Sequence, residues 1–232
     1  GTFTSLHSFQ IFEGSCTCAA LKLGSDGALY GTSATGGYMF GTVFRIDSAG
    51  TYTELHRFYD LTDGRNPNTS LILGSDGALY GTTPGGGPSG IGTVFRIDSA
   101  GTFTALHSFD YPDGAIPGPH PLAGLALASD GALYGTTQNG GSSNFGTVFR
   151  LDGGGTFTSL HSFHGTDGVY PEVALALGSD GALYGTTEFG GPSFSRDTGG
   201  SGDGTVFKID IAGTFTFLHS FSFADGSQPR VP

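Results

Sequence analysis

The 232-residue sequence is poor in basic residues, with nine Lys and Arg against twenty Asp and Glu, a net charge of −11 at pH 7. A basic face for nucleic acid or anionic lipid is therefore absent. No apolar run approaches the roughly 18 residues of a membrane helix, and residues 1–20 lack the pattern of a signal peptide. Because the chain opens on Gly1, we expect a mature or excised piece.

Cysteine is also scarce, and glycine is abundant. Two cysteines, Cys16 and Cys18, are too few and too close for a disulfide framework, so free thiols, a local bridge and an intermolecular bond all stay open. The 43 glycines do not recur at every third position, which excludes collagen. Twenty Phe and nine Tyr can fill a core, which argues against a disordered chain.

Three strings recur along the chain at intervals of 49 to 58 residues. Ser-Asp-Gly-Ala-Leu-Tyr-Gly-Thr begins at Ser25, Ser75, Ser129 and Ser179. Gly-Thr-Val-Phe begins at Gly41, Gly92, Gly146 and Gly204. Leu-His-Ser-Phe, or its variant with Arg57, begins at Leu6, Leu55, Leu106, Leu160 and Leu218. An acidic residue and a glycine follow each of these, starting at Glu13, Asp63, Asp113, Asp167 and Asp225.

Each repeat predicts four short antiparallel strands, named a to d, joined by turn residues. In the fourth copy we expect them at 173–178, 182–187, 205–210 and 214–221. Neither face of strand d is strongly polar, which predicts burial on both sides. Four strands in about 50 residues are typical of a β-propeller blade. A solenoid is the second choice.

We therefore predict an all-β fold, a β-propeller of four complete four-stranded antiparallel blades in a single repeat domain, 1–232. The expected parts are an orphan N-terminal strand d (1–9), blades 1 to 4 (10–58, 59–109, 110–163 and 164–221) and the start of a further repeat (222–232).

The layout of these strings resembles NHL-type propeller blades. Their residues are similar to those of the bacterial GloVer repeat of choice-of-anchor tandem-repeat surface proteins. The resemblance implies a secreted or surface-anchored bacterial protein. It brings no assigned reaction and no catalytic residues.

The orphan strand at residues 1–9 has three interpretations. The chain is a fragment of a larger ring, a closed four-bladed ring with an added edge strand, or a molecule that completes a blade in a neighbour, as a homo-oligomer or polymer.

Recognition is expected on the side of the blades that carries the b–c loops, because these loops vary between copies. Their aromatic and polar groups suit a carbohydrate or a protein ligand. The candidate ligand-binding residues are Tyr38, Phe40, Asn139, Asn144, Phe145, Phe189, Phe194, Arg196 and Asp197. Packing anchors within glycine-rich loops are the alternative.

The repeated polar residues predict packing roles. The strand-d histidines are expected to bridge adjacent blades by a hydrogen bond, and the linker acids to start turns rather than bind calcium. The strand-c cations are expected to pair with the aspartates two residues on, as Arg45 with Asp47. Only His120 and His164 lie outside the pattern and need a local reason.

No catalytic motif, phosphate loop or zinc spacing is present, so no catalytic residue, metal or cofactor is predicted. We expect a non-enzymatic extracellular or cell-surface propeller that binds a glycan or a protein. The alternatives are a structural subunit of a surface fibre or coat joined by strand exchange, and a hydrolase or lyase with its site at the central channel. Nucleic acid and a membrane span are not expected.

Overall fold

The computed structural model describes residues 4–10, 13–14, 19–36, 40–110, 124–195 and 201–229. Within these ranges the protein is built of β-strands, turns and loops, with no helix. No described segment therefore forms a helix that could cross a membrane.

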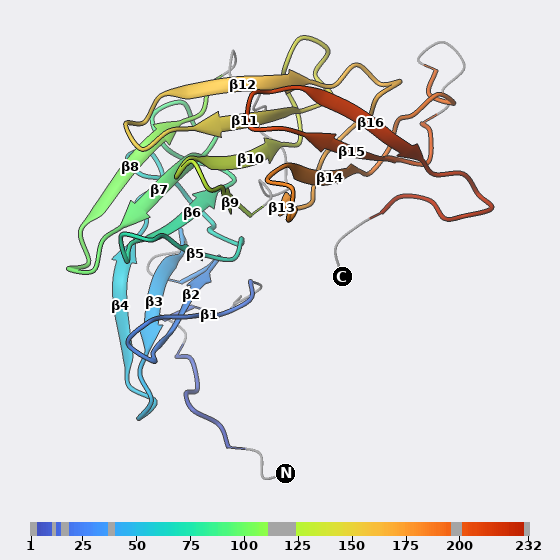
Figure 1. Ribbon diagram of the computed structural model, residues 1–232. Coiled ribbons are helices and arrows are strands. Elements are labelled where there is room, and N and C mark those ends of the chain that lie inside the picture. Colours follow the sequence, from blue (N-terminus) through green and yellow to red (C-terminus); the bar gives the residue numbers. More distant parts are fainter. Residues whose placement is uncertain are drawn as a thin grey trace. The chain divides into compact units, whose positions relative to one another are not determined.

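The strands form four-stranded antiparallel sheets, each a simple meander in chain order (Figure 1). The first sheet contains β1 (Lys22–Leu23), β2 (Leu29–Ser33), β3 (Thr42–Ile46) and β4 (Tyr52–Arg57). The second contains β5 (Ile72–Leu73), β6 (Leu79–Thr83), β7 (Thr93–Ile97) and β8 (Phe103–Ser108). The third contains β9 (Ala126–Leu127), β10 (Leu133–Thr137), β11 (Thr147–Leu151) and β12 (Phe157–Ser162). The fourth contains β13 (Ala176–Leu177), β14 (Leu183–Thr187), β15 (Thr205–Ile209) and β16 (Phe215–Ser220).

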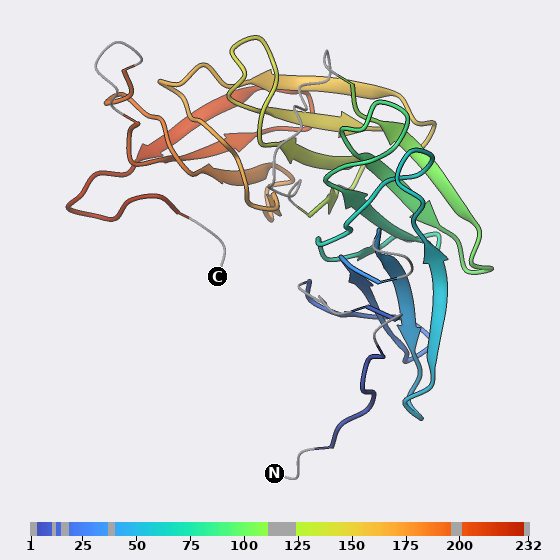
Figure 2. The same ribbon diagram turned by 180° about the vertical axis from the view of Figure 1, so that it is seen from behind.

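The chain divides into two compact units, Gly1–Ser108 with the first two sheets and Phe109–Pro232 with the last two. Figure 2 allows each meander to be followed from behind. In each sheet the a–b and c–d turns lie at one end of the strands, which we call the turn side. The b–c loops lie at the other end, the loop side.

Aromatic residues fill the space between the two sheets of each unit. Phe58, directly after β4, is fully buried and meets the ring of Phe95 edge-on at 5.3 Å. Phe163 meets Phe207 in the same way at 5.2 Å in the second unit. The ring of Phe95 lies over strand b, where a Cβ added to Gly81 would be 2.5 Å from it. Glycine at this place therefore lets the aromatic core approach the backbone.

Strand d departs from a regular alternation. Val206 pairs with His219 and Phe207 with Phe217, which leaves Leu218 as a β-bulge, and the other sheets shift register at the same point. The prediction that both faces of strand d are buried is wrong for β16, where Phe217 is 40% and Leu218 46% exposed.

Residues 4–9 lie against the first sheet without forming a strand. The ring of His7 stacks on Tyr52 at 5.2 Å, and Phe9 meets Phe44 edge-on at 5.1 Å. Strand d elsewhere bonds to strand c of its own repeat, and residues 4–9 have no such partner in the described part of the chain. The segment thus makes the side-chain contacts expected of a strand d without its hydrogen bonds.

Candidate functional site

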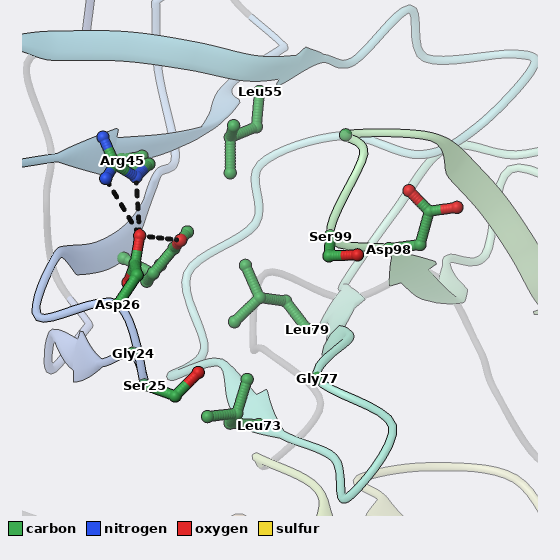
Figure 3. A pocket seen from close by; sticks show the side chains of 12 residues that line it. Gly24, Ser25, Asp26, Arg45, Leu55, Leu73, Gly77, Leu79, Asp98 and Ser99 are labelled. Carbon is green, nitrogen blue, oxygen red and sulfur yellow. Dashed lines mark hydrogen bonds and ion pairs between the residues drawn. The ribbon is translucent and has the colours of Figure 1, made fainter.

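A pocket of about 310 Å³ opens on the turn side of the first unit, between its two sheets (Figure 3). The a–b turn of the first sheet and the c–d turn of the second form opposite walls. Its lining residues are Gly24, Ser25, Asp26, Tyr30, Arg45, Leu55, Leu73, Gly77, Leu79, Asp98, Ser99 and Gly101.

One wall carries a fixed acid–base cluster. Arg45 donates to Asp26 Oδ2 from Nη2 at 2.9 Å and from Nε at 3.1 Å. The Tyr30 hydroxyl donates to the same oxygen at 3.0 Å. The hydrogen bond from Arg45, together with that from the Ala28 amide, lowers the pKa of Asp26, so this carboxylate stays ionised.

The same ion pair occurs in every sheet and corrects the predicted pairing. Arg96, Arg150 and Lys208 bond to Asp76, Asp130 and Asp180, respectively, in the a–b turns. The predicted partners, Asp47, Asp98, Asp152 and Asp210, instead accept main-chain N–H groups of the c–d turns. Asp47 Oδ1, for example, accepts from the amides of Ala49 and Thr51, both at 2.9 Å. The turn amides satisfy these carboxylates locally, so the cations bond across the sheet.

Apolar side chains form the middle of the pocket. Leu55, Leu73 and Leu79 lie between Asp26 and Arg45 on one side and Asp98 and Ser99 on the other (Figure 3). Tyr30 is half-buried and borders this apolar surface. The pocket therefore combines an apolar surface with two carboxylates, one guanidinium and two serine hydroxyls.

The corresponding place in the second unit is more closed. Tyr134, which matches Tyr30, is fully buried, and its hydroxyl lies 3.5 Å from the main-chain oxygen of Ile211. Ile211 stands where the second sheet has Ser99, and Ala128 stands where the first has Gly24. Larger side chains at these two turn positions accompany the burial of the tyrosine.

Sequence reasoning placed the ligand on the loop side instead. Tyr38, Arg196 and Asp197 lie outside the described residues. Phe40 is half-buried and packs against the core of the first unit. The other candidates, Asn139, Asn144, Phe145, Phe189 and Phe194, lie in the loops of the second unit.

Those loop residues contact one another or nearby backbone. Phe145 and Phe194 meet edge-on at 5.2 Å, and Phe189 meets Tyr170 at 6.3 Å. Asn144 Oδ1 accepts from the amide of Gly140 at 2.8 Å, while Asn139 donates to the side chain of Gln138. These contacts are those of packing anchors, and they bring Phe145 and Phe194 together.

His56 and His161, on strand d of the first and third sheets, make two contacts each. His56 Nε2 lies 2.8 Å from Asp63 Oδ2 in the d–a linker, and its ring stacks on Phe103 of the next sheet at 3.9 Å. His161 repeats this with Asp167 at 3.0 Å and Phe215 at 3.8 Å. Within each unit this histidine thus joins the two sheets through stacking and a linker hydrogen bond, in a packing role.

The linker acids form the predicted turns. Asp63 Oδ1 accepts from the Tyr59 amide at 2.7 Å, and Asp225 Oδ1 from the Ser222 amide at 2.7 Å. In the part of the chain that the structure describes, no three His, Cys, Asp or Glu side chains converge as metal ligands. Asp113, Cys16 and Cys18 lie outside the described residues.

His164 lies at the loop side of the third sheet, where it has local polar contacts. Its Nε2 lies 3.2 Å from Ser142 Oγ in the b–c loop, and its Nδ1 lies 3.7 Å from Asp167 Oδ2. The imidazole side chain is 56% exposed. It links the b–c loop to the d–a linker, whereas His120 lies outside the described residues.

Repeated antiparallel sheets of this kind define a propeller-type repeat protein. The sequence model of the Gloeobacter/Verrucomicrobia repeat matches residues 1–196, so the chain belongs to that family. A comparison with curated proteins finds no sequence match.

Solved structures support the propeller fold. A gluconolactonase from Xanthomonas campestris is 18% identical with a TM-score of 0.52, over 89% of this chain and 62% of that one. A puromycin-hydrolysing peptidase from Mycobacterium tuberculosis is 14% identical with a TM-score of 0.55, over 92% of this chain and 30% of that one. The chain thus spans less than two thirds of either protein. These likenesses confirm the predicted β-propeller class.

Proposed function

We propose that this chain is a carbohydrate-binding part of a bacterial surface propeller, with one neutral sugar unit held in the turn-side pocket of the first unit. The supporting observation is the pocket itself, an apolar surface of three leucines between two polar walls. Its volume of about 310 Å³ suits a compact ligand and lies at the small end of the usual range of roughly 300–1,000 Å³.

The chemistry of the walls favours a sugar. The C–H face of a pyranose packs on apolar side chains, and its hydroxyls donate to carboxylates and accept from a guanidinium or a serine hydroxyl. Asp26 and Arg45 already hold each other in place, so their positions need little ordering when a ligand binds. Two carboxylates against one guanidinium in the lining disfavour an anionic ligand.

The loop side remains a predicted site for a glycan or a protein, through the residues given above. We place the ligand on the turn side because Phe145 and Phe194 already contact each other. The hydrolase or lyase alternative at the central channel remains a prediction of another class. This alternative requires that the chain by itself turn over a substrate such as a sugar lactone or a peptide.

The test is saccharide binding by the full chain, using a panel of neutral monosaccharides followed by saturation-transfer NMR and calorimetry. Ser99→Ile puts into the pocket wall the residue found at position 211, and it is expected to weaken binding at least about tenfold. Ser48→Ile is the matched control. Ser48 is the exposed serine of the equivalent turn in the first sheet and does not line the pocket.

Binding that both variants keep would contradict the pocket, and would favour the loop side if Phe194→Ala removed it. Absence of binding across the neutral panel, with an intact fold, would contradict the carbohydrate proposal as a whole. Binding of uronic acids in preference to neutral sugars would contradict the charge argument.

A further inference from the structure

The outer face of the fourth sheet carries the residues that make sheet-to-sheet contacts elsewhere in the chain, and no described residue of its own unit covers them. His219 has its hydrogen bond to Asp225 at 2.9 Å, as the other strand-d histidines have to their linker acids. Its side chain is 51% exposed, however, against 17% for His7, His56 and His161. No ring from a following sheet lies over His219 among the described residues.

Apolar residues extend this face. Leu218, the counterpart of the pocket residue Leu55, is 46% exposed. Phe221 is half-buried, whereas its counterparts Phe58 and Phe163 are fully buried under the next sheet. We call Leu218, His219 and Phe221 the donor face, because their counterparts in the first and third sheets pack against the following sheet.

The matching acceptor is the surface of the first sheet, formed by Phe44, Gly50 and Tyr52. Residues 4–9 occupy it, with His7 on Tyr52, Phe9 on Phe44, and the backbone of Leu6 against Gly50. Residues 2–9 and 214–221 have the same sequence except at Ser5 and Phe217. The segment that covers the acceptor is therefore a copy of the strand that forms the donor face.

This cover is incomplete. Leu6 is 51% exposed, and Phe9 is half-buried where Phe58 is fully buried. Residues 4–9 also lack the strand hydrogen bonds that hold β16 in its sheet. An ordered β16 from another molecule offers the same side chains on a rigid strand, at a lower ordering cost.

We propose that two copies of this chain associate head to tail, the donor face of one replacing residues 4–9 on the first sheet of the other. Such a contact is heterologous, so it produces chains or closed rings of molecules rather than an isologous dimer. The proposal rests on residues separate from the turn-side pocket and is independent of the sugar ligand.

The experiment is sedimentation velocity of the full chain over a wide concentration range. His7→Ala with Phe9→Ala removes the contacts of the covering segment and is expected to strengthen association at least about tenfold. Phe221→Ala removes a central residue of the donor face, and this variant is expected to sediment as a monomer of 23.7 kDa. Leu61→Ser, which removes another exposed apolar residue, is the control and leaves association unchanged.

Mixing gives a second measurement. The His7→Ala, Phe9→Ala, Phe221→Ala chain can only accept, so it is expected to bind the unmodified chain and not the Phe221→Ala chain. If Phe221→Ala fails to fold by circular dichroism, His219→Ala takes its place, because half of that side chain already faces solvent. The proposal is overturned if all forms stay monomeric, or if association survives loss of the donor face.

Discussion

The turn sides of the two units are built from the same strings and differ in how far they open. In the first unit Tyr30 borders a pocket, while in the second the matching Tyr134 is fully buried. Both hydroxyls bond to the aspartate of the a–b turn, at 3.0 and 3.1 Å. The difference therefore lies in what surrounds the tyrosine rather than in its own hydrogen bond.

Two turn positions that face these tyrosines differ between the units. A Cβ added to Gly24 would lie 2.5 Å from the Tyr30 ring, so an alanine there requires the ring to move. The second unit has Ala128 at that position and Ile211 opposite. The strands are thus nearly constant between the units, while the residues at these turn positions differ in size.

The largest expected effect comes from truncating the two tyrosines. Tyr134→Ala removes a fully buried ring and is expected to lower the free energy of unfolding by about 3–5 kcal/mol. Tyr30→Ala removes a half-buried ring that borders a pocket, and about 1–2 kcal/mol is expected. Urea unfolding followed by circular dichroism measures both. Equal losses would mean that the two sites do not differ in packing.

The next prediction exchanges the turn residues. Ala128→Gly with Ile211→Ser is expected to open the second unit and create a second sugar site, with affinity within about tenfold of the first. Calorimetric stoichiometry then rises from one ligand to two. Gly24→Ala is the reverse change and weakens binding, whereas Gly74→Ala brings the same kind of ring contact at Tyr80 without lining the pocket. An unchanged stoichiometry, with the fold intact, would show that other residues set the difference.

The third prediction tests whether the opening is local to the turn side. On the loop side of the same interface His56 is stacked on Phe103 and bonded to Asp63. Burial lowers the pKa of His56, against the opposing effect of Asp63. The unfolded chain therefore binds more protons below its pKa of about 6.5, and stability falls as the pH drops from there towards the folded pKa.

His56→Gln is expected to make the free energy of unfolding depend less on pH over this range, while leaving sugar binding unchanged. Unfolding midpoints in urea at several pH values between about 7 and 5 measure the slope, on either side of the ordinary histidine pKa. A binding loss in this variant would mean that the two sides of the interface open together.

Strands b and c could be predicted closely from the sequence. The expected 182–187 and 205–210 correspond to Leu183–Thr187 and Thr205–Ile209, because alternation and turn residues act over short distances. Strand a was expected over 173–178 and covers only Ala176–Leu177. The β-bulge at Leu218 was also missed, since it depends on pairing with the neighbouring strand.

The pocket could not be predicted in the same way, because contact between two sheets creates it. Variable loops directed the prediction to the loop side, while the turns looked nearly identical in every copy. The available signal was small: Ser99 against Ile211, and Gly24 against Ala128. Such differences acquire meaning only when the facing turn is known. The Arg45–Asp26 pair was missed for a related reason, because it joins strand c to the a–b turn rather than residues close in sequence.

The smallest expected effect concerns these ion pairs. The hydrogen bond from Arg45 is the main cause that lowers the pKa of Asp26. For Asp130, burial acts to raise the pKa, and the hydrogen bond from the Ala132 amide lowers it more than the hydrogen bond from Arg150 does. Arg45→Ala is therefore expected to raise the pKa of Asp26 by more than Arg150→Ala raises that of Asp130. Titration of the side-chain carboxyl carbons by NMR measures both, with Asp76 as an internal control.

The sign of the accompanying stability change follows from the direction of these shifts. A carboxyl whose pKa is lowered in the fold stabilises it above the unfolded pKa of about 4, and this is lost as the pH falls through the folded value. Loss of Arg45 moves that fall to higher pH in the first unit. Equal shifts at Asp26 and Asp130 would mean that their different exposure, 42% and 25% of the side chain, does not alter how the arginine acts. Unequal shifts would extend the difference between the two turn sides from packing to electrostatics.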